Sequence, residues 1–161
     1  MIPSPVEIRR AVDEDVPLIQ AFIRKLAEYE RMSHQVVSTE EHLREALFGP
    51  RPVIEALLAF SDGEPAGFAL YFETYSTFRG QRGIFLEDLF VEPEHRGRGI
   101  GARLLAATAK AAHDRGGRLE WLVLEWNQPA IEFYKRLGAE RVEGWNSYRL
   151  DGEGLQRLAQ T

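Results

Sequence analysis

The chain has 161 residues, 44% of them hydrophobic, which is a common size for one globular domain with its own core. Twenty basic against 25 acidic residues leave a net charge of -5, which argues against a nucleic-acid or anionic-membrane binder and suits a cationic partner better. The absence of cysteine excludes disulfides, a thiolate zinc site and a cysteine nucleophile.

The sequence shows no linker that would divide it into domains and no candidate membrane-spanning segment. No stretch approaches the roughly 20 apolar residues of a transmembrane helix, and residues 1–10 lack the apolar run of a signal peptide. No repeat, low-complexity segment or Pro/Gly/Ser-rich linker is present. We therefore expect a single domain over residues 1–161, soluble and cytoplasmic.

The first part of the chain predicts a strand followed by two helices. Residues 6–8 alternate as in a strand, and Asp13 then precedes apolar residues at helical spacing, as a helix cap does. Ser38 and Glu41 have the spacing of a capping box, which predicts a second, short amphipathic helix.

The middle of the chain predicts a hairpin and a central strand. The apolar runs 53–60 and 66–72 flank Asp62-Gly63, a strong hairpin signal, so these strands should pair antiparallel. Residues 84–91 are apolar on both faces, as in a central strand, apart from two adjacent acids.

The last third predicts a crossover and a further helix. A helix over residues 99–112 followed by a strand over 121–124 implies parallel neighbours in the sheet. Asn127 can cap a helix that Gly138 ends, and short strands near Arg141 and Tyr148 should finish the sheet. The fold class is therefore a mixed α/β sheet.

The run from Arg96 to Gly101 suits an anion. Glycines let backbone N–H groups approach a phosphate, and the start of the following helix adds unsatisfied donors and partial positive charge. The ordinary alternative is a Gly/Arg surface turn. Gly97-x-Gly99-x-x-Ala102 also satisfies the permissive dinucleotide fingerprint, but it follows a polar segment after an antiparallel hairpin, which leaves a dinucleotide-binding protein as a remote alternative.

Several spaced motifs give a family resemblance. Arg96-x-x-Gly99-x-Gly101 matches the acetyl-CoA pyrophosphate motif of the Gcn5-related N-acetyltransferase (GNAT) superfamily. Segments 75–78, 86–91, 125–130 and 133–139 resemble the diamine (spermidine/spermine) and thialysine acetyltransferase group. The resemblance implies a central, mostly antiparallel twisted sheet, with a parallel strand pair splayed at the acetyl-CoA site and helices on both faces.

The resemblance also implies an enzyme that binds acetyl-CoA and needs no metal. The four histidines are scattered singly, which agrees with the absence of a metal site. Tyr134 would also act as proton donor to the departing thiolate, although a core tyrosine is the ordinary interpretation of its apolar stripe. The implied cofactor-binding residues are Leu89, Phe90, Val91, Arg96, Gly97, Arg98, Gly99, Ile100, Gly101, Ala102, Asn127, Pro129 and Tyr134.

The two acids of the central strand should do different jobs, because successive side chains point to opposite faces. Glu87 would lie with Phe85 and Leu89, and Asp88 with Leu86 and Phe90. An acid in an apolar strand is costly and has a raised pKa, so Glu87 is the candidate general base, directly or through a water. Asp88 can anchor the substrate ammonium, and either acid can instead form a buried pair with an arginine or cap a loop.

The acceptor is expected to be a small cationic amine, either a short diamine or a lysine-like or thialysine-like side chain. Ser76 and Phe78 stand where polyamine enzymes carry an acid and a tryptophan, which makes long polyamines less suitable. The group also forms homodimers, so we expect a homodimer with no nucleic-acid or membrane partner. A non-catalytic acyl-CoA-binding regulatory domain is the alternative function. The implied substrate-binding residues are Glu30, Asp88, Glu143, Trp145, Ser76 and Phe78.

Overall fold

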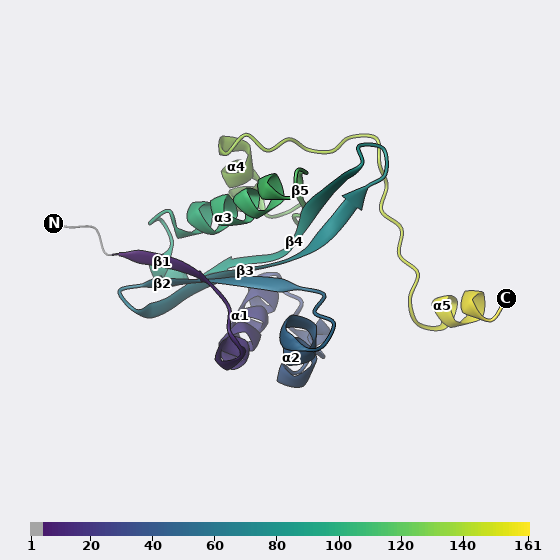
Figure 1. The fold of residues 1–161 in the computed structure, drawn as a ribbon, viewed down its shortest axis with the longest axis horizontal. Coiled ribbons are helices and arrows are strands. Elements are labelled where there is room, and N and C mark those ends of the chain that lie inside the picture. The colour runs from purple at the N-terminus through teal and green to yellow at the C-terminus, as the bar shows by residue number, and fades with distance from the viewer. Residues whose placement is uncertain (1–4) are drawn as a thin grey trace. The chain divides into compact units, whose positions relative to one another are not determined.

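The structure, a computed structural model, describes residues 5–161, so the first four residues of the N-terminal stretch lie outside it. The chain divides into two compact units, and the division falls between Leu124 and Glu125. Within the described residues, the first unit holds a five-stranded sheet with helices α1 to α3, and the second holds α4 and α5 (Figure 1).

The sheet has the order β1-β2-β3-β4-β5 and is antiparallel except for the parallel pair β4–β5. The predicted mixed sheet and its parallel crossover are therefore confirmed. The last strand lies two residues earlier than predicted, because residues 119–121 and not 121–124 pair with β4. The strands are β1 (Val6–Arg10), β2 (Glu55–Ser61), β3 (Glu64–Ser76), β4 (Gln81–Val91) and β5 (Leu119–Trp121).

In the first unit, helices cover both faces of the sheet. Helices α1 and α2 lie on one face and α3 lies on the other (Figure 1). No described helix has the length and apolar character needed to cross a bilayer. The helices are α1 (Val16–Tyr29), α2 (Glu40–Phe48), α3 (Ile100–Asp114), α4 (Gln128–Arg136) and α5 (Gly152–Ala159), with short 3-10 turns η1 (Asp13–Asp15), η2 (Ser33–Gln35) and η3 (Pro93–His95).

Two predicted helix starts are displaced. Asp13 lies in the 3-10 turn ahead of α1, and the residue directly before the helix is Asp15, whose carboxylate accepts hydrogen bonds from Arg9 and from the N–H of Val12. Thr39 and not Ser38 caps α2, because its backbone is extended and its hydroxyl accepts from the N–H of His42 at 3.2 Å. Each shift leaves the helix itself as predicted.

The predicted hairpin between β2 and β3 is confirmed. Ser61 pairs with Glu64, so the loop has two residues, and both have positive φ angles: 54° at Asp62 and 80° at Gly63. This backbone matches the right-handed twist of the flanking strands, which is why Asp-Gly signals such a turn. The hairpin sets the register of β3, against which β4 then pairs.

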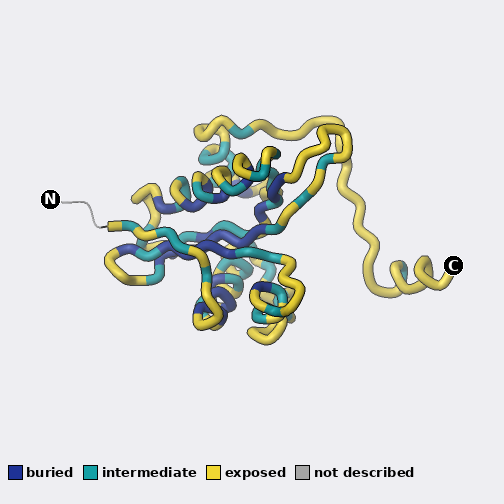
Figure 2. The backbone as a smooth tube through the Cα atoms, viewed as in Figure 1, coloured by how far each residue is buried: buried dark blue, intermediate teal, exposed yellow. Residues whose placement is uncertain are grey.

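The core of the first unit lies between the sheet and the α1/α2 layer. Phe22 of α1 stacks on Phe68 of β3 with ring centroids 5.5 Å apart, and Phe90 of β4 lies 5.9 Å from Phe22. Such aromatic pairs contribute about 0.5–1.5 kcal/mol each beyond the burial of their area. Figure 2 shows the buried residues along the strands and on the sides of the helices that face them.

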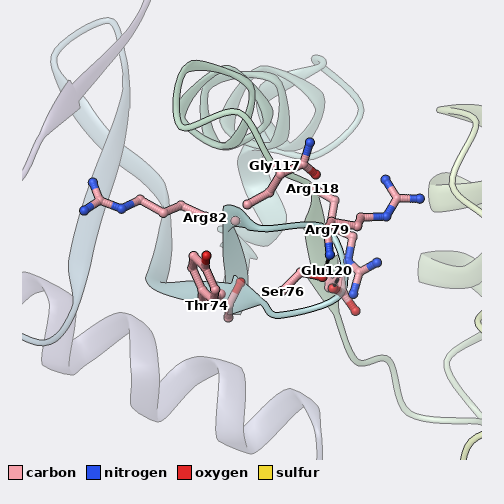
Figure 3. A pocket seen from close by; sticks show the side chains of 10 residues that line it. Thr74, Ser76, Arg79, Arg82, Gly117, Arg118 and Glu120 are labelled. Carbon is pink, nitrogen blue, oxygen red and sulfur yellow. Dashed lines mark hydrogen bonds and ion pairs between the residues drawn. The ribbon is translucent and has the colours of Figure 1, made fainter.

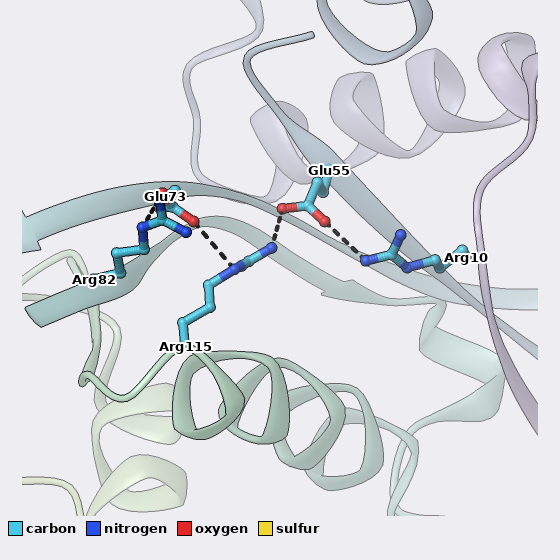
Figure 4. Close-up of polar contacts among 5 residues, drawn as sticks. All are labelled: Arg10, Glu55, Glu73, Arg82 and Arg115. Atoms are coloured by element: carbon cyan, nitrogen blue, oxygen red, sulfur yellow. Dashed lines mark hydrogen bonds and ion pairs between the residues drawn. The ribbon is translucent and has the colours of Figure 1, made fainter.

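A network of ion pairs joins the end of α3 to the sheet (Figure 4). The Arg115 guanidinium lies 2.6 Å from a carboxylate oxygen of Glu55 on β2 and 3.3 Å from one of Glu73 on β3. Arg10 contacts the same Glu55, and Arg82 contacts the same Glu73. The arginine therefore ties the C-terminus of α3 to two neighbouring strands.

The short strands expected near Arg141 and Tyr148 are absent from the structure. Residues 139–151 of the second unit have no regular secondary structure, and the side chains of Trp145 and Tyr148 are 81% and 93% exposed. A strand needs a partner edge for its hydrogen bonds, and no described strand pairs with this segment. The prediction is therefore wrong for this structure.

Candidate functional site

The two parallel strands of the sheet separate after a short stretch of pairing. Residues 84–86 of β4 pair with residues 119–121 of β5, where β5 ends. Strand β4 continues for five more residues, 87–91, which have no strand partner on that side within the described sheet. The carbonyl of Val91 accepts a hydrogen bond from Arg96, and the other backbone groups on that side can hydrogen-bond an extended ligand.

The loop that follows β4 ends in a helix start suited to an anion. Gly97 and Gly99 both have φ of 76°, a left-handed conformation that glycine adopts without cost, and a Cβ on either would meet no atom within 4 Å. No side chain caps the first turn of α3, a helix of 15 residues. The unsatisfied N–H groups and the helix dipole therefore favour a negative group above this loop.

The two arginines of the loop differ in their surroundings. The Nε of Arg96 donates a hydrogen bond to the carbonyl of Val91 at 2.9 Å, and its guanidinium lies 5.2 Å from the ring centroid of Tyr29 and 5.6 Å from that of Phe90. Arg98 is exposed, and it makes neither the hydrogen bond to Val91 nor the aromatic contacts that Arg96 makes. Its charge is thus available to a ligand.

A β-bulge lies at the two acids of β4. Leu70 of β3 pairs with Asp88 and the next residue, Tyr71, pairs with Leu86, so Glu87 is the extra residue without a partner on β3. Because Leu70 and Tyr71 point to opposite faces, Asp88 and Leu86 do too. The prediction that Asp88 shares a face with Leu86 is therefore wrong, because the bulge interrupts the alternation.

The bulge directs Asp88 to the α1 face, where Leu70 and Phe90 belong to the core. Burial, and then the neighbouring carboxylates of Glu87 and Glu30, raise the pKa of Asp88 from 3.8 to about 7. Burial also raises the pKa of Glu30, the residue that ends α1. Glu87 itself is exposed, so the burial that the sequence predicted for this acid is found at Asp88 instead. Such a group of acids gains by binding a cation, which removes their mutual repulsion.

Two contacts at this site were not predicted from the sequence. Lys25 of α1 forms an ion pair with Glu92, a buried carboxylate directly after β4, and Tyr29 lies against Arg96. Both connect the end of α1 to the end of β4. No sequence pattern relates positions more than 60 residues apart, so only the tertiary structure could reveal them.

Ser76 and Phe78 lie at the other end of β4. Ser76 pairs with Gln81 at the start of the strand and lines a small pocket with Thr74, Arg79 and Arg118 (Figure 3). Phe78, at the tip of the β3–β4 turn, is 100% exposed. Asp88 is seven residues beyond Gln81, which at about 3.3 Å per residue is roughly 20 Å away. Within one chain, Ser76 and Phe78 therefore lie too far from Asp88 to share a small substrate with it.

The second unit holds the remaining predicted residues. Asn127 caps α4 as predicted, since its side-chain oxygen accepts a hydrogen bond from the N–H of Ala130, and Pro129 lies in the first turn. Tyr134 of the same helix is half-buried, with its ring 5.4 Å from that of Phe133. The exposed residues Glu143 and Trp145 lie in the segment without regular secondary structure.

Comparison with known proteins supplies the family. Residues 19–139 match the model of the acetyltransferase (GNAT) family. Thialysine N-epsilon-acetyltransferase from Bos taurus is 43% identical, covering 96% of this chain and 97% of the relative. L-ornithine N5-acetyltransferase from Arabidopsis thaliana is 32% identical over 94% of this chain and 86% of the relative.

Solved structures agree with this assignment. An integron cassette protein from the mobile metagenome of V. cholerae superposes with a TM-score of 0.79 and 29% identity, covering 97% of this chain and 98% of that one. An aminoglycoside N-acetyltransferase in complex with CoA has the same fold, with a TM-score of 0.73 at 20% identity over 92% and 98% of the two chains. The dinucleotide-binding alternative is thereby set aside. This chain belongs to the GNAT acetyltransferase family and is an acetyltransferase.

Proposed function

We propose that this acetyltransferase moves an acetyl group from acetyl-CoA to the terminal amine of a lysine-like amino acid or a short diamine. The observation that carries the proposal is the position of three acids, Glu30, Glu87 and Asp88, where β4 loses its β5 partner and runs towards the anion-binding loop. A cationic acceptor suits the acids, and a donor with a pyrophosphate suits the loop. Relatives at 43% and 32% identity are named for thialysine and ornithine, both amino acids with a terminal amine.

The donor is held by β4 and the loop in this proposal. Leu89, Phe90 and Val91, whose carbonyl also accepts from Arg96, line the edge of β4 along which the pantetheine arm runs. Residues 97–102 surround the pyrophosphate with N–H groups. Arg98 adds a positive charge. Asn127 and Pro129 remain further cofactor contacts of the proposal. Acetyl-CoA supplies an activated thioester carbonyl to this arrangement.

The acceptor amine must lose a proton before it can attack the thioester. Glu87, exposed at the bulge, receives this proton through a water, while Asp88 and Glu30 hold the ammonium form on arrival. The amine nitrogen then bonds to the carbonyl carbon and the carbon–sulfur bond breaks. Tyr134 gives its phenolic proton to the thiolate that leaves, because a phenol remains protonated at neutral pH.

The oligomeric state and organisation form part of the same proposal. The family match spans residues 19–139 and crosses both compact units, which supports one catalytic domain. We propose a cytoplasmic homodimer. Ser76 and Phe78 lie roughly 20 Å from Asp88 along one chain, so a substrate role for them requires a second copy. Glu143 and Trp145 remain further substrate contacts of the proposal. Light scattering of the purified protein measures the oligomeric state directly.

A thiol-release assay tests the function. The purified chain is mixed with acetyl-CoA and one amine at a time: thialysine, lysine, ornithine, putrescine or spermidine. We expect a higher kcat/KM for the amino acids or putrescine than for spermidine, because Ser76 and Phe78 provide neither an extra acid nor an indole for a long polyamine. A clear preference for spermidine would contradict the proposed acceptor, and absence of transfer to every amine would contradict the proposed reaction.

A further inference from the structure

The side chain of Arg96 reaches from the loop ahead of α3 to the end of α1. Its Nε donates to the carbonyl of Val91, which closes the turn η3 onto the end of β4. Its guanidinium lies over the ring of Tyr29, in the last turn of α1, at 5.2 Å from the centroid. Phe90, a core residue, provides a second aromatic face at 5.6 Å. Arg96, a residue of the loop ahead of α3, therefore contacts both the end of β4 and the end of α1.

A second contact attaches the same part of α1. Lys25 forms an ion pair with Glu92, whose side chain is only 10% exposed and which directly follows Val91. Lys25 and Tyr29 are four residues apart, so they lie on one face of the helix. The last two turns of α1 are thus joined, once each at Lys25 and Tyr29, to the residues that lead from β4 into the loop.

Glu30 follows Tyr29 directly and ends α1. The next residue, Arg31, has a φ of 61°, and the N–H of Met32 bonds back to the carbonyl of Ala27 at 2.7 Å, so the chain turns away immediately. Glu30 is therefore held between a turn on one side and Tyr29 on the other. Asp88 lies on the sheet face that α1 covers, so the end of α1 at Glu30 and the carboxyl of Asp88 are on the same side of the sheet.

We propose that Arg96 is a positioning residue that couples the acetyl-CoA loop to the acceptor site, by holding Tyr29 and hence Glu30 in place beside Asp88. The proposal rests on the proposed function. When the loop is ordered by a bound pyrophosphate, Arg96 is ordered with it, and the end of α1 gains a fixed contact. Donor and acceptor should then bind cooperatively, and each must strengthen the binding of the other by the same factor.

The competing role is a simple one, in which Arg96 only adds positive charge for the pyrophosphate. The two roles predict different kinetics. If Arg96 only attracts the pyrophosphate of acetyl-CoA, its loss should raise KM for acetyl-CoA. If it positions the end of α1, its loss should raise KM for the amine and weaken the coupling between the two ligands. Arg98, two residues further along the same loop, offers a matched comparison because it lacks the contacts to Val91 and Tyr29.

The experiment compares Arg96→Met with Arg98→Met, and Tyr29→Leu with Tyr29→Phe. Steady-state kinetics give both KM values, and calorimetry gives the affinity for CoA with and without the preferred amine. We expect Arg96→Met and Tyr29→Leu to raise KM for the amine about tenfold and to lower the coupling factor by a similar amount. Tyr29→Phe keeps the ring and should stay closer to wild type than Tyr29→Leu. Arg98→Met should raise KM for acetyl-CoA alone.

Equal behaviour of Arg96→Met and Arg98→Met, with only KM for acetyl-CoA raised, would overturn the proposal. If Arg96→Met does not fold, as judged by circular dichroism, the two Tyr29 variants decide: an unchanged coupling factor in Tyr29→Leu overturns it equally. Failure of the proposed function is a distinct result, since the wild type would then acetylate none of the amines.

Discussion

Asp88 on β4 lies opposite Leu70 on β3, on the sheet face that α1 covers. This pairing exists because Glu87 is an extra residue in its strand. A regular strand would turn Asp88 with Leu86 towards the α3 face. The bulge instead turns the carboxyl of Asp88 to the side of the sheet on which Glu30 ends α1. Burial there, with the charges of Glu87 and Glu30, raises the pKa of Asp88 to about 7.

The first prediction concerns stability and pH. The pKa of Asp88, raised to about 7 from 3.8, means that its ionised form is disfavoured in the folded state. The resulting loss of unfolding free energy is absent below about pH 4, grows as the pH rises towards 7 and is constant above pH 7. Relative to Asp88→Asn, the wild type should lose roughly 2 kcal/mol of unfolding free energy over this range, after allowance for screening. Urea unfolding at pH 4.5, 6 and 8 measures it; parallel curves for the two proteins would refute it.

The second prediction concerns the proposed general base. Glu87→Gln removes the proton acceptor, so kcat should fall about 100-fold while KM for acetyl-CoA stays within twofold. Part of the loss should be recovered at higher pH, where more of the amine is already neutral. Glu94→Gln, at an exposed acid in η3, serves as the control and should behave as wild type. A Glu87→Gln enzyme with full turnover at pH 7 would assign the base elsewhere.

The third prediction concerns the proposed acid. Tyr134→Phe keeps the ring next to Phe133 but removes the phenolic proton. We expect kcat to fall about 100-fold, as for loss of a general acid, with CoA affinity preserved in calorimetry. Tyr148→Phe, at a tyrosine that is 93% exposed, is the matched control. Near-normal turnover of Tyr134→Phe would rule out the assignment.

The fourth prediction concerns Gly99 in the loop ahead of α3. It separates the left-handed backbone conformation, which affects stability, from the open space above the loop, which affects cofactor binding. Gly99→Ala places a Cβ in a left-handed conformation at a cost of roughly 1–2 kcal/mol and also intrudes on the space above the loop. KM for acetyl-CoA should rise at least about tenfold. Gly63→Ala, at a hairpin residue with φ of 80° and open space, should cost similar stability with no effect on KM. Equal KM values in both variants would argue against a cofactor role.

The fifth prediction concerns the ion pairs at the end of α3. Arg115→Met removes contacts to both Glu55 and Glu73, whose side chains are 34% and 45% exposed. Screening limits the loss to about 1 kcal/mol, and it should shrink in 1 M salt. Lys110→Met, in the exposed pair with Asp114, should have little effect at either salt concentration. Thermal melts at low and high salt measure both, and a loss that is independent of salt would assign the effect of Arg115 to packing.

The sequence alone was sufficient for the features that depend on neighbouring residues. The Asp62-Gly63 turn, the Asn127 cap and the glycine loop at the start of α3 are local, because their backbone angles and hydrogen bonds involve residues within four positions. The mixed sheet followed from the order of such elements. The cap of α2 moved from Ser38 to Thr39 because either hydroxyl can accept from a backbone N–H at a helix start.

The tertiary structure decided what depends on two segments meeting. The face occupied by Asp88 depends on the register of β4 against β3, and a bulge is invisible in the alternation of one strand. The contact of Arg96 with Tyr29 joins residues 67 positions apart, and the roughly 20 Å between Ser76 and Asp88 is the length of a strand. The sequence thus determined which chemical groups the protein carries, and the pairing of strands and the docking of α1 decided which of them act together.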